Sequence, residues 1–283
     1  MNPQSSDDKF IDIDDVIRKK NPKLLKAIPS FLIRYLKNII HQDDLNDILK
    51  NNKNNYGLAF VAGALVQLET KYSIINIENI PTSGRYIFAS NHPLGGLDGL
   101  IMLDVVGKNF PDCKFVVNDL LMNIKNLESI LLPVNKHGRQ SNEYFKLIDD
   151  AYKSNTQILY FPAGLCSRKI NGIITDTIWH KSFITNAVKY ERDIIPVYFE
   201  ARNSNFFYNL ARIRKFLGIK INFEMLYLPD EMYKQKKRKI SISFGKPISY
   251  KIFDKNKTPS EWALYIREIV YSLKNNKTET QNI

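Results

Sequence analysis

The chain has 283 residues, 44% of them hydrophobic, which is enough for one large core with appended elements. Two cysteines and the lack of an apolar N-terminal leader favour a reducing, cytoplasm-facing location, and no window approaches the ~20 apolar residues of a membrane-spanning helix. A formal net charge of +12 suits nucleic acid, anionic lipid or an acidic carrier protein, but no nucleic-acid-binding module accompanies the basic run at residues 234–239, so we expect no nucleic-acid partner.

The N-terminal part is predicted to be helical after a loosely ordered arm of about 20 residues. Residues 23–40 place apolar side chains on one face and basic side chains on the other, with a break at Pro29, which predicts a pair of basic amphipathic helices. Such a pair suits the surface of an anionic membrane, and it equally suits packing on the protein's own core. A second helical stretch runs from Asp43 through Tyr56 to Leu68. We expect residues 1–70 to form this N-terminal part and residues 71–283 to form the main domain.

From residue 72 onward, short apolar runs alternate with helical stretches, which is typical of an α/β layer architecture. Thr258, Pro259 and Glu261 are start signals for the last helix. Strands are predicted at residues 73–77, 85–90, 114–117, 130–134, 157–161, 194–198, 220–226 and 240–244, and helices at 99–108, 142–153, 181–190 and 260–274.

The loop after the second predicted strand contains a histidine and an aspartate that are suited to general-base catalysis. His92 and Asp98 lie six positions apart, and Gly95 and Gly96 break the loop between them. An imidazole removes a proton efficiently when a carboxylate fixes its tautomer and stabilises the imidazolium that forms. The alternative is structural, with His92 as a helix cap and Asp98 as a turn residue.

Three other predicted strands end in polar or turn-forming residues, and open α/β sheets gather their sites at the carboxyl ends of strands. Strand 130–134 leads to Lys136 and Arg139, and strand 194–198 leads to Glu200. Strand 157–161 leads into a turn and a polar segment that contain Pro162, Gly164, Ser167, Arg168 and Lys169.

These segments resemble the four sequence blocks of the glycerolipid acyltransferases of the lysophosphatidate type, in the same order and at comparable spacing. The first block is residues 90–100, Ser-Asn-His-Pro-Leu-Gly-Gly-Leu-Asp-Gly-Leu, and the third block is residues 161–167, Phe-Pro-Ala-Gly-Leu-Cys-Ser. Residues 243–248 resemble the closing strand of that family. The similarity covers residues 72–249 and is greatest to a hemolysin-like branch, some members of which acylate amino-acid lipids. The resemblance implies a single α/β acyltransferase domain with a mixed central sheet flanked by helices.

In that family the histidine and aspartate of the first block deprotonate the acceptor hydroxyl as it attacks an acyl thioester, which assigns these roles to His92 and Asp98. Five residues separate His92 from Asp98 in this chain, whereas four separate the two residues in the family. Gly95 and Gly96 give the loop freedom to accommodate the extra residue.

The third block departs from the family pattern, because the Glu and Arg that help to hold the acceptor's glycerol phosphate are absent. Either the acceptor carries another headgroup, or Arg168 and Lys169 take over this role.

The expected reaction needs no metal and no covalent intermediate. Backbone N–H groups of Gly95 and Gly96, or the cations Lys136 and Arg139, would face the oxyanion. An acyl-enzyme on Cys166 or Ser167 is the alternative, although the turn lacks a nucleophile-elbow pattern. Four scattered histidines without ligand spacing predict no metal site. The predicted substrate-binding residues are Asn91, Gly95, Gly96, Lys136, Arg139, Pro162, Gly164, Ser167, Arg168 and Lys169.

The resemblance also implies partners. The co-substrate would be acyl-CoA or acyl-ACP (acyl carrier protein), with no other cofactor, and the acceptor a lysolipid, either lysophosphatidate or a lyso-aminolipid. We expect peripheral attachment to anionic lipid on the cytoplasmic side of the cell membrane. The run at residues 203–210 would line an acyl channel, dip into lipid or join the core. The alternatives are an N-acyltransferase that forms acyl amino acids and a non-catalytic lipid-binding protein.

Overall fold

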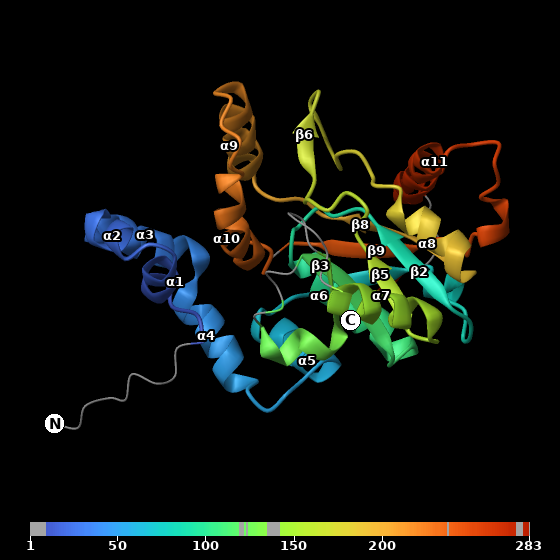
Figure 1. Ribbon diagram of the computed structural model, residues 1–283, viewed down its shortest axis with the longest axis horizontal. Coiled ribbons are helices and arrows are strands. Elements are labelled where there is room, and N and C mark those ends of the chain that lie inside the picture. The colour runs from blue at the N-terminus through green and yellow to red at the C-terminus, as the bar shows by residue number, and fades with distance from the viewer. Residues whose placement is uncertain are drawn as a thin grey trace.

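The computed structural model describes residues 10–118, 122, 124–134, 142–236, 238–275 and 280–282. The strands of the main sheet are β1 (Tyr72–Ile75), β2 (Tyr86–Ser90), β3 (Cys113–Asn118), β4 (Leu131–Val134), β5 (Gln157–Tyr160), β8 (Asp193–Glu200), β9 (Ile240–Phe244) and β10 (Thr280–Asn282). Within these ranges they form one eight-stranded sheet in the order β10-β1-β9-β8-β2-β5-β3-β4 (Figure 1).

The sheet is mixed, as expected. β8, β2, β5, β3 and β4 run parallel to one another, whereas β9 is antiparallel to β8. β1 is parallel to β9, and β10 is antiparallel to β1. Because β2 lies between β5 and β8, the loop that follows it emerges at the middle of the sheet.

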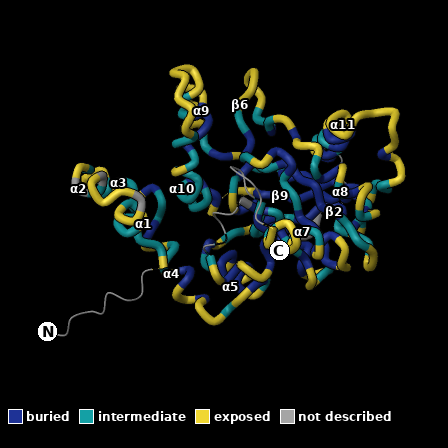
Figure 2. Tube along the Cα trace, viewed as in Figure 1, coloured by how far each residue is buried: buried dark blue, intermediate teal, exposed yellow. Residues whose placement is uncertain are grey.

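Helices cover both faces of the sheet, which explains why its central strands are buried almost throughout (Figure 2). Alternate residues of β2 enter different cores: Phe88 packs with α5 (Leu58–Gln67) and α6 (Leu97–Asn109). Ile87 and Ala89 pack on the other face. The helices of that face are α7 (Asn142–Lys153), α8 (Ser182–Tyr190) and α11 (Pro259–Ser272).

The predicted start of the last helix is confirmed. The Thr258 side chain accepts a hydrogen bond from the backbone of Glu261, the Glu261 side chain bonds back to the backbone of Thr258, and Pro259 occupies the first helical turn. This is a capping box.

The N-terminal part is more ordered than expected. Helix α1 (Ile13–Lys20) begins at Asp12, whose side chain caps it, so part of the predicted loose arm is helical. The break at Pro29 is confirmed, because α2 (Pro22–Ala27) ends before it and α3 (Ser30–Ile40) begins after it. The next stretch forms two helices, α4 (Gln42–Asn51) and α5. The division at residue 70 stays a prediction.

The predicted strand at residues 220–226 is wrong. These residues lead into a 3-10 helix, η4 (Phe223–Tyr227), followed by α10 (Leu228–Tyr233). The reason is Glu224, whose side chain is fully buried and forms ion pairs with Arg168 and Arg214. The basic run that begins at Lys234 follows α10.

A two-stranded hairpin was not predicted. It consists of β6 (Arg168–Ile170) and β7 (Ile173–Thr175), which are antiparallel. The turn residues Asn171 and Gly172 have φ angles of 48° and 84°, as a type I′ turn requires.

The aromatic pair Phe206 and Phe207 lies in a helix, α9 (Asn205–Phe216), and not in a loop before one. Phe207 is fully buried, whereas Phe206 is 49% exposed, so only Phe207 joins the core. Helix α9 projects beside the β6–β7 hairpin (Figure 1). In the part of the chain that the structure describes, no helix is long and apolar enough to cross a membrane.

Candidate active site

The structure brings His92 and Asp98 together. The Nδ1 atom of His92 lies 3.0 Å from Oδ2 of Asp98. The ring of His92 stacks on Phe161 with 3.9 Å between ring centroids and an interplanar angle of 20°. The His92 side chain is 14% exposed, so one edge remains accessible to a substrate. This is the arrangement expected of a general base and the carboxylate that orients it.

Asp98 is held as an ionised carboxylate would be. Its side chain has no exposed surface, and Oδ2 also accepts the N–H of Leu94 at 2.9 Å, while Oδ1 accepts the N–H of Gly99 at 3.0 Å. Asp98 lies in the first turn of α6, where the helix dipole stabilises negative charge. These donors fix the position of the Asp98 side chain beside the ring of His92.

A second buried carboxylate, Asp176, anchors the segments on either side of the site, and the sequence analysis missed it. Oδ1 of Asp176 accepts the backbone N–H of His92 at 3.2 Å and the hydroxyl of Ser167. Oδ2 accepts the indole N–H of Trp179 at 2.9 Å. Burial raises the pKa of Asp176, and the hydrogen bonds from Ser167 and Trp179 oppose that shift.

The other residues of the first block have distinct positions. The side chain of Asn91 is buried and exchanges hydrogen bonds with the backbone of Phe199 in β8, at 3.0 Å and 2.7 Å. Asn91 therefore joins the loop to the sheet. Gly95 has a φ of 83°, and a Cβ there would lie 2.8 Å from Leu228, so a larger residue would be strained and crowded. Gly96 precedes α6 and has open space around it.

The third block packs against the first. The backbone N–H of Ser167 donates to the carbonyl of His92 at 2.7 Å, so the two segments lie side by side. Pro162 is buried and its carbonyl accepts the N–H of His180 at 2.9 Å. Gly164 is exposed, with a φ of 62° that suits the turn.

Cys166 is buried among side chains and is not presented to a substrate. Burial raises the pKa of its thiol to about 11, and the nearby Arg168 lowers it by a smaller amount. A thiol in this state is a poor nucleophile at neutral pH.

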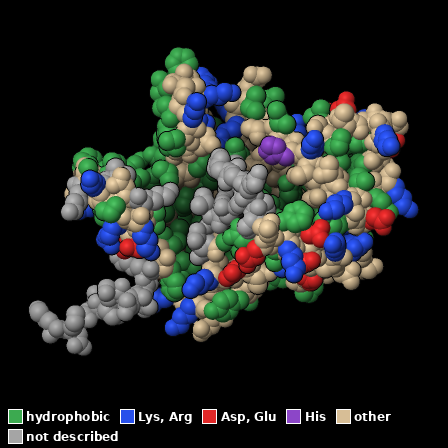
Figure 3. All heavy atoms as spheres, in the orientation of Figure 1, with side chains coloured by type: hydrophobic (Ala, Val, Ile, Leu, Met, Phe, Trp, Pro, Cys, Tyr) green, Lys and Arg blue, Asp and Glu red, His purple; other side chains and the backbone are tan. Residues whose placement is uncertain are grey.

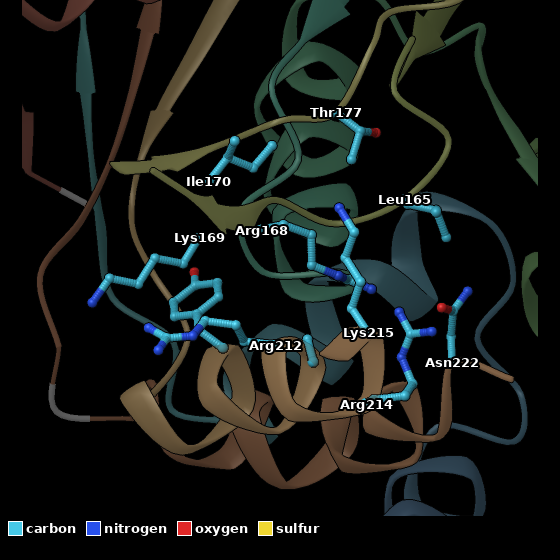
Figure 4. A pocket seen from close by; sticks show the side chains of 11 residues that line it. Leu165, Arg168, Lys169, Ile170, Thr177, Arg212, Arg214, Lys215 and Asn222 are labelled. Carbon is cyan, nitrogen blue, oxygen red and sulfur yellow. The ribbon is translucent and has the colours of Figure 1, made fainter. Parts of the chain in front are cut away.

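A basic pocket of about 250 Å³ lies between the β6–β7 hairpin and α9. Figure 4 shows the side chains of Arg168, Arg214 and Lys215 between these two elements. Arg168 donates to Oε1 of Glu224 at 3.1 Å, and Arg214 forms an ion pair with the same carboxylate at 2.8 Å. The lining residues are Leu165, Arg168, Lys169, Ile170, Thr177, Tyr208, Ala211, Arg212, Arg214, Lys215 and Asn222.

Two predicted oxyanion contacts, Lys136 and Arg139, lie outside the described residues. Within the described ranges, no group of three or more His, Cys, Asp or Glu side chains is placed to hold a metal ion.

Comparison with known proteins identifies the family. The family profile described as Acyltransferase matches residues 15–279. A lyso-glycine lipid O-acyltransferase of Bacteroides thetaiotaomicron is 46% identical over 265 residues, covering 93% of this chain and 97% of that protein. A lyso-glycine lipid O-acyltransferase of Phocaeicola vulgatus is 45% identical, with 93% and 95% covered.

The chain therefore belongs to this acyltransferase family, and the expectation of an acyl-transferring enzyme is confirmed. Among solved structures, the 1-acyl-sn-glycerophosphate acyltransferase PlsC of Thermotoga maritima matches with a TM-score of 0.49 and 17% identity over 84% of this chain and 83% of that one.

Proposed function

We propose that this enzyme moves a fatty acyl chain from an acyl thioester to the hydroxyl of a lysolipid, and that the lysolipid is a lyso-glycine lipid. Two relatives at 46% and 45% identity, each covered almost entirely, are named lyso-glycine lipid O-acyltransferases. The observation that carries the proposal is the contact of 3.0 Å between Nδ1 of His92 and the buried carboxylate of Asp98.

This contact assigns the proton positions in the proposed mechanism. Nδ1 of His92 carries the hydrogen that Asp98 accepts, so Nε2 is the basic atom. Nε2 takes the proton of the acceptor hydroxyl as its oxygen attacks the thioester carbonyl. When the tetrahedral intermediate collapses, the C–S bond breaks and the imidazolium returns the proton to the leaving thiolate. Backbone N–H groups at Gly95 and Gly96, beside the N-terminus of α6, would stabilise the oxyanion.

The acceptor headgroup would lie near the third block. Arg168 and Lys169 line the basic pocket, and the backbone of the preceding residue, Ser167, contacts His92 directly. An anionic headgroup in this pocket would be attracted by its cations, which replace the Glu and Arg of the family pattern. Asn91, Pro162 and Gly164 would shape the site without contributing charge.

The donor would be acyl-ACP or acyl-CoA, and the net charge of +12 suits either one. The chemistry requires no metal or cofactor besides this thioester. Because the acceptor is a lipid, we place the enzyme peripherally on anionic lipid at the cytoplasmic side of the cell membrane. The exposed apolar residues Phe31, Leu32 and Tyr35 of α3 support a lipid contact there.

The test is acyl transfer from labelled palmitoyl-ACP and palmitoyl-CoA to lyso-glycine lipid, lysophosphatidate and free glycine, comparing the intact chain with His92→Ala. We expect an ester product with lyso-glycine lipid and a loss of roughly 10³-fold in kcat in the variant. His180→Ala is the matched control, because this exposed histidine lies outside the pair. A product with free glycine alone would favour N-acylation, and lipid binding without any product would favour a non-catalytic protein.

A further inference from the structure

Two projecting elements enclose the basic pocket and extend beyond it. Helix α9 is followed by the non-helical residues 217–222, and the β6–β7 hairpin lies beside the helix, so that both project from the same side of the molecule (Figure 1). We call residues 168–175 and 212–222 together the prong surface. The two segments are distant in sequence, and Glu224 joins them through its ion pairs with Arg168 and Arg214.

The outer parts of the prong surface are apolar and exposed. Phe216 is 88% exposed, Ile221 is 76% exposed and Ile173 is 68% exposed. Figure 3 shows hydrophobic side chains over the end of α9 with Lys and Arg side chains beside them. Isolated exposed apolar residues are common, but a gathered set marks an interaction surface. The exposed apolar residues of the prong surface are Ile170, Ile173, Ile213, Phe216, Leu217, Ile219 and Ile221.

The charge on these segments is of one sign. Residues 168–175 and 212–222 contain six Lys or Arg residues and no Asp or Glu. Glu224 neutralises part of the charge of Arg168 and Arg214, whereas Lys169, Arg212 and Lys215 form no ion pair with the described residues. These three cations are exposed, so they are available to an anionic partner.

We propose that the prong surface docks the enzyme on an anionic lipid bilayer. Its apolar ends would enter the boundary between headgroups and acyl chains, and its cations would lie at the level of the lipid phosphates, as in other interfacial elements. The inference rests on the proposed function, because a lipid acceptor must be reached from the bilayer. Docking in this way would present the basic pocket directly to the headgroups, and its lining residue Arg168 directly follows Ser167, whose backbone contacts His92.

The first test is sedimentation with vesicles of phosphatidylcholine alone and with phosphatidylglycerol added, without donor or acceptor. Phe216→Ser/Ile221→Ser should weaken binding by roughly tenfold for each inserted side chain. Arg212→Gln/Lys215→Gln should weaken only the phosphatidylglycerol-dependent part, by about fivefold for each cation. The matched controls are Val66→Ser/Leu264→Ser and Lys251→Gln/Lys255→Gln, which alter exposed residues elsewhere and should bind as the intact chain does. Thermal melting verifies that each variant is folded.

The second test is hydrogen exchange of the intact chain with and without the vesicles. The prong surface should gain protection when vesicles are added. Protection confined to residues 13–40, or unchanged binding by both prong variants, would overturn the proposal. So would a loss of affinity for acyl carrier protein in Arg212→Gln/Lys215→Gln with vesicle binding unchanged. His92→Ala should bind vesicles as the intact chain does. Vesicle binding therefore tests the docking proposal separately from the proposed acyl transfer, and it remains a valid test if no acyl transfer is found.

Discussion

The geometry around His92 depends on several side chains and not on its contact with Asp98 alone. Asp98 contacts the ring at Nδ1, Phe161 covers one face of the ring, and Asp176 fixes the backbone N–H. The ring therefore has little rotational freedom.

Replacing the orienting carboxylate should abolish most activity without unfolding the protein. In Asp98→Asn, an amide oxygen and an NH₂ group replace two acceptors, so the ring of His92 loses its preferred tautomer. We expect kcat to fall by roughly 10³-fold with a small change in KM. Asp104→Asn, on the same helix but bonded to Tyr72 and Lys108, is the control and should keep its activity. Equal losses in both variants would mean that Asp98 acts only through stability.

Asp176 is a positioning residue, and its replacement should separate rate from folding. Asp176→Asn keeps the volume but turns an NH₂ group towards either Trp179 or the shared donors of His92 and Ser167. We expect kcat to fall by about tenfold or more, with a loss of ~1–3 kcal/mol in the free energy of unfolding. Steady-state kinetics and urea unfolding of the variant measure both quantities. A kcat equal to that of the intact chain would contradict the positioning role.

Cys166 should be chemically inert in the folded enzyme. Burial raises the pKa of its thiol to about 11, so at neutral pH the protonated form dominates. Alkylation by iodoacetamide should remain slow until the pH approaches that value, because only the thiolate reacts. Cys166→Ala should transfer acyl chains at the normal rate. A stable acyl adduct on Cys166, trapped by rapid acid quench and mass spectrometry, would instead support the covalent alternative.

The pairing of His92 with Asp98 could be predicted because the two residues are only six positions apart, across one short loop and the first turn of α6. Asp176 was missed because it is 84 residues from the N–H group that it binds. Glu224 was missed because a lone carboxylate in an apolar run gives no sign of its partners. Side chains that support a site from distant segments have no periodic pattern in the sequence.

Glu224 joins three elements, since it lies in η4 and pairs with Arg168 of β6 and Arg214 of α9. Glu224→Gln would leave two largely buried guanidinium groups without a counter-charge. We expect a loss of about 3–5 kcal/mol in the free energy of unfolding and a raised KM for the acceptor. Guanidinium unfolding and acceptor titration measure these effects. The exposed Glu268→Gln on α11 is the control, and a Glu224→Gln protein as stable as that control would contradict the structural role.

Most regular elements could be predicted because their cores are continuous. The strand at residues 86–90 begins with the apolar run Tyr86–Ala89, and the capping residues Thr258 and Glu261 mark a helix directly. Residues 220–226 were wrongly predicted as a strand, because their apolar side chains are exposed or lie in a turn of helix around the buried charge of Glu224. The Asn171–Gly172 pair is a recognised hairpin signal and could have identified β6 and β7.

At the scale of the whole molecule, His41 connects the N-terminal helices to the rest. It joins α3 to α4 with a φ of 54°, stacks on Tyr233 with 4.2 Å between ring centroids, and contacts Asp44 at 2.8 Å and Asp230 at 3.2 Å. His41 therefore helps to fix α3 relative to α10, together with the hydrogen bond between the hydroxyl groups of Tyr35 and Tyr227.

His41→Ala should loosen this connection. We expect a loss of about 1–3 kcal/mol in stability, because two hydrogen bonds to charged groups disappear. Amides of residues 30–51 should exchange faster, while those of β2 and β5 should not change. Hydrogen exchange with mass spectrometry separates the two regions, and His180→Ala provides the comparison. Uniform acceleration in both regions would show that the helices are not a separately opening unit.

The position of β1 has a consequence for how the chain folds. β1 pairs with β9 and β10, which come from the other end of the chain, whereas β2 finds its neighbours β5 and β8 sooner. During synthesis, β1 emerges from the ribosome before β9 and β10. This apolar strand therefore stays unpaired until they follow. Distant pairings of this kind slow folding and expose strand edges to aggregation. The part of the sheet that carries the His92 loop can thus assemble before β1 pairs with β9 and β10.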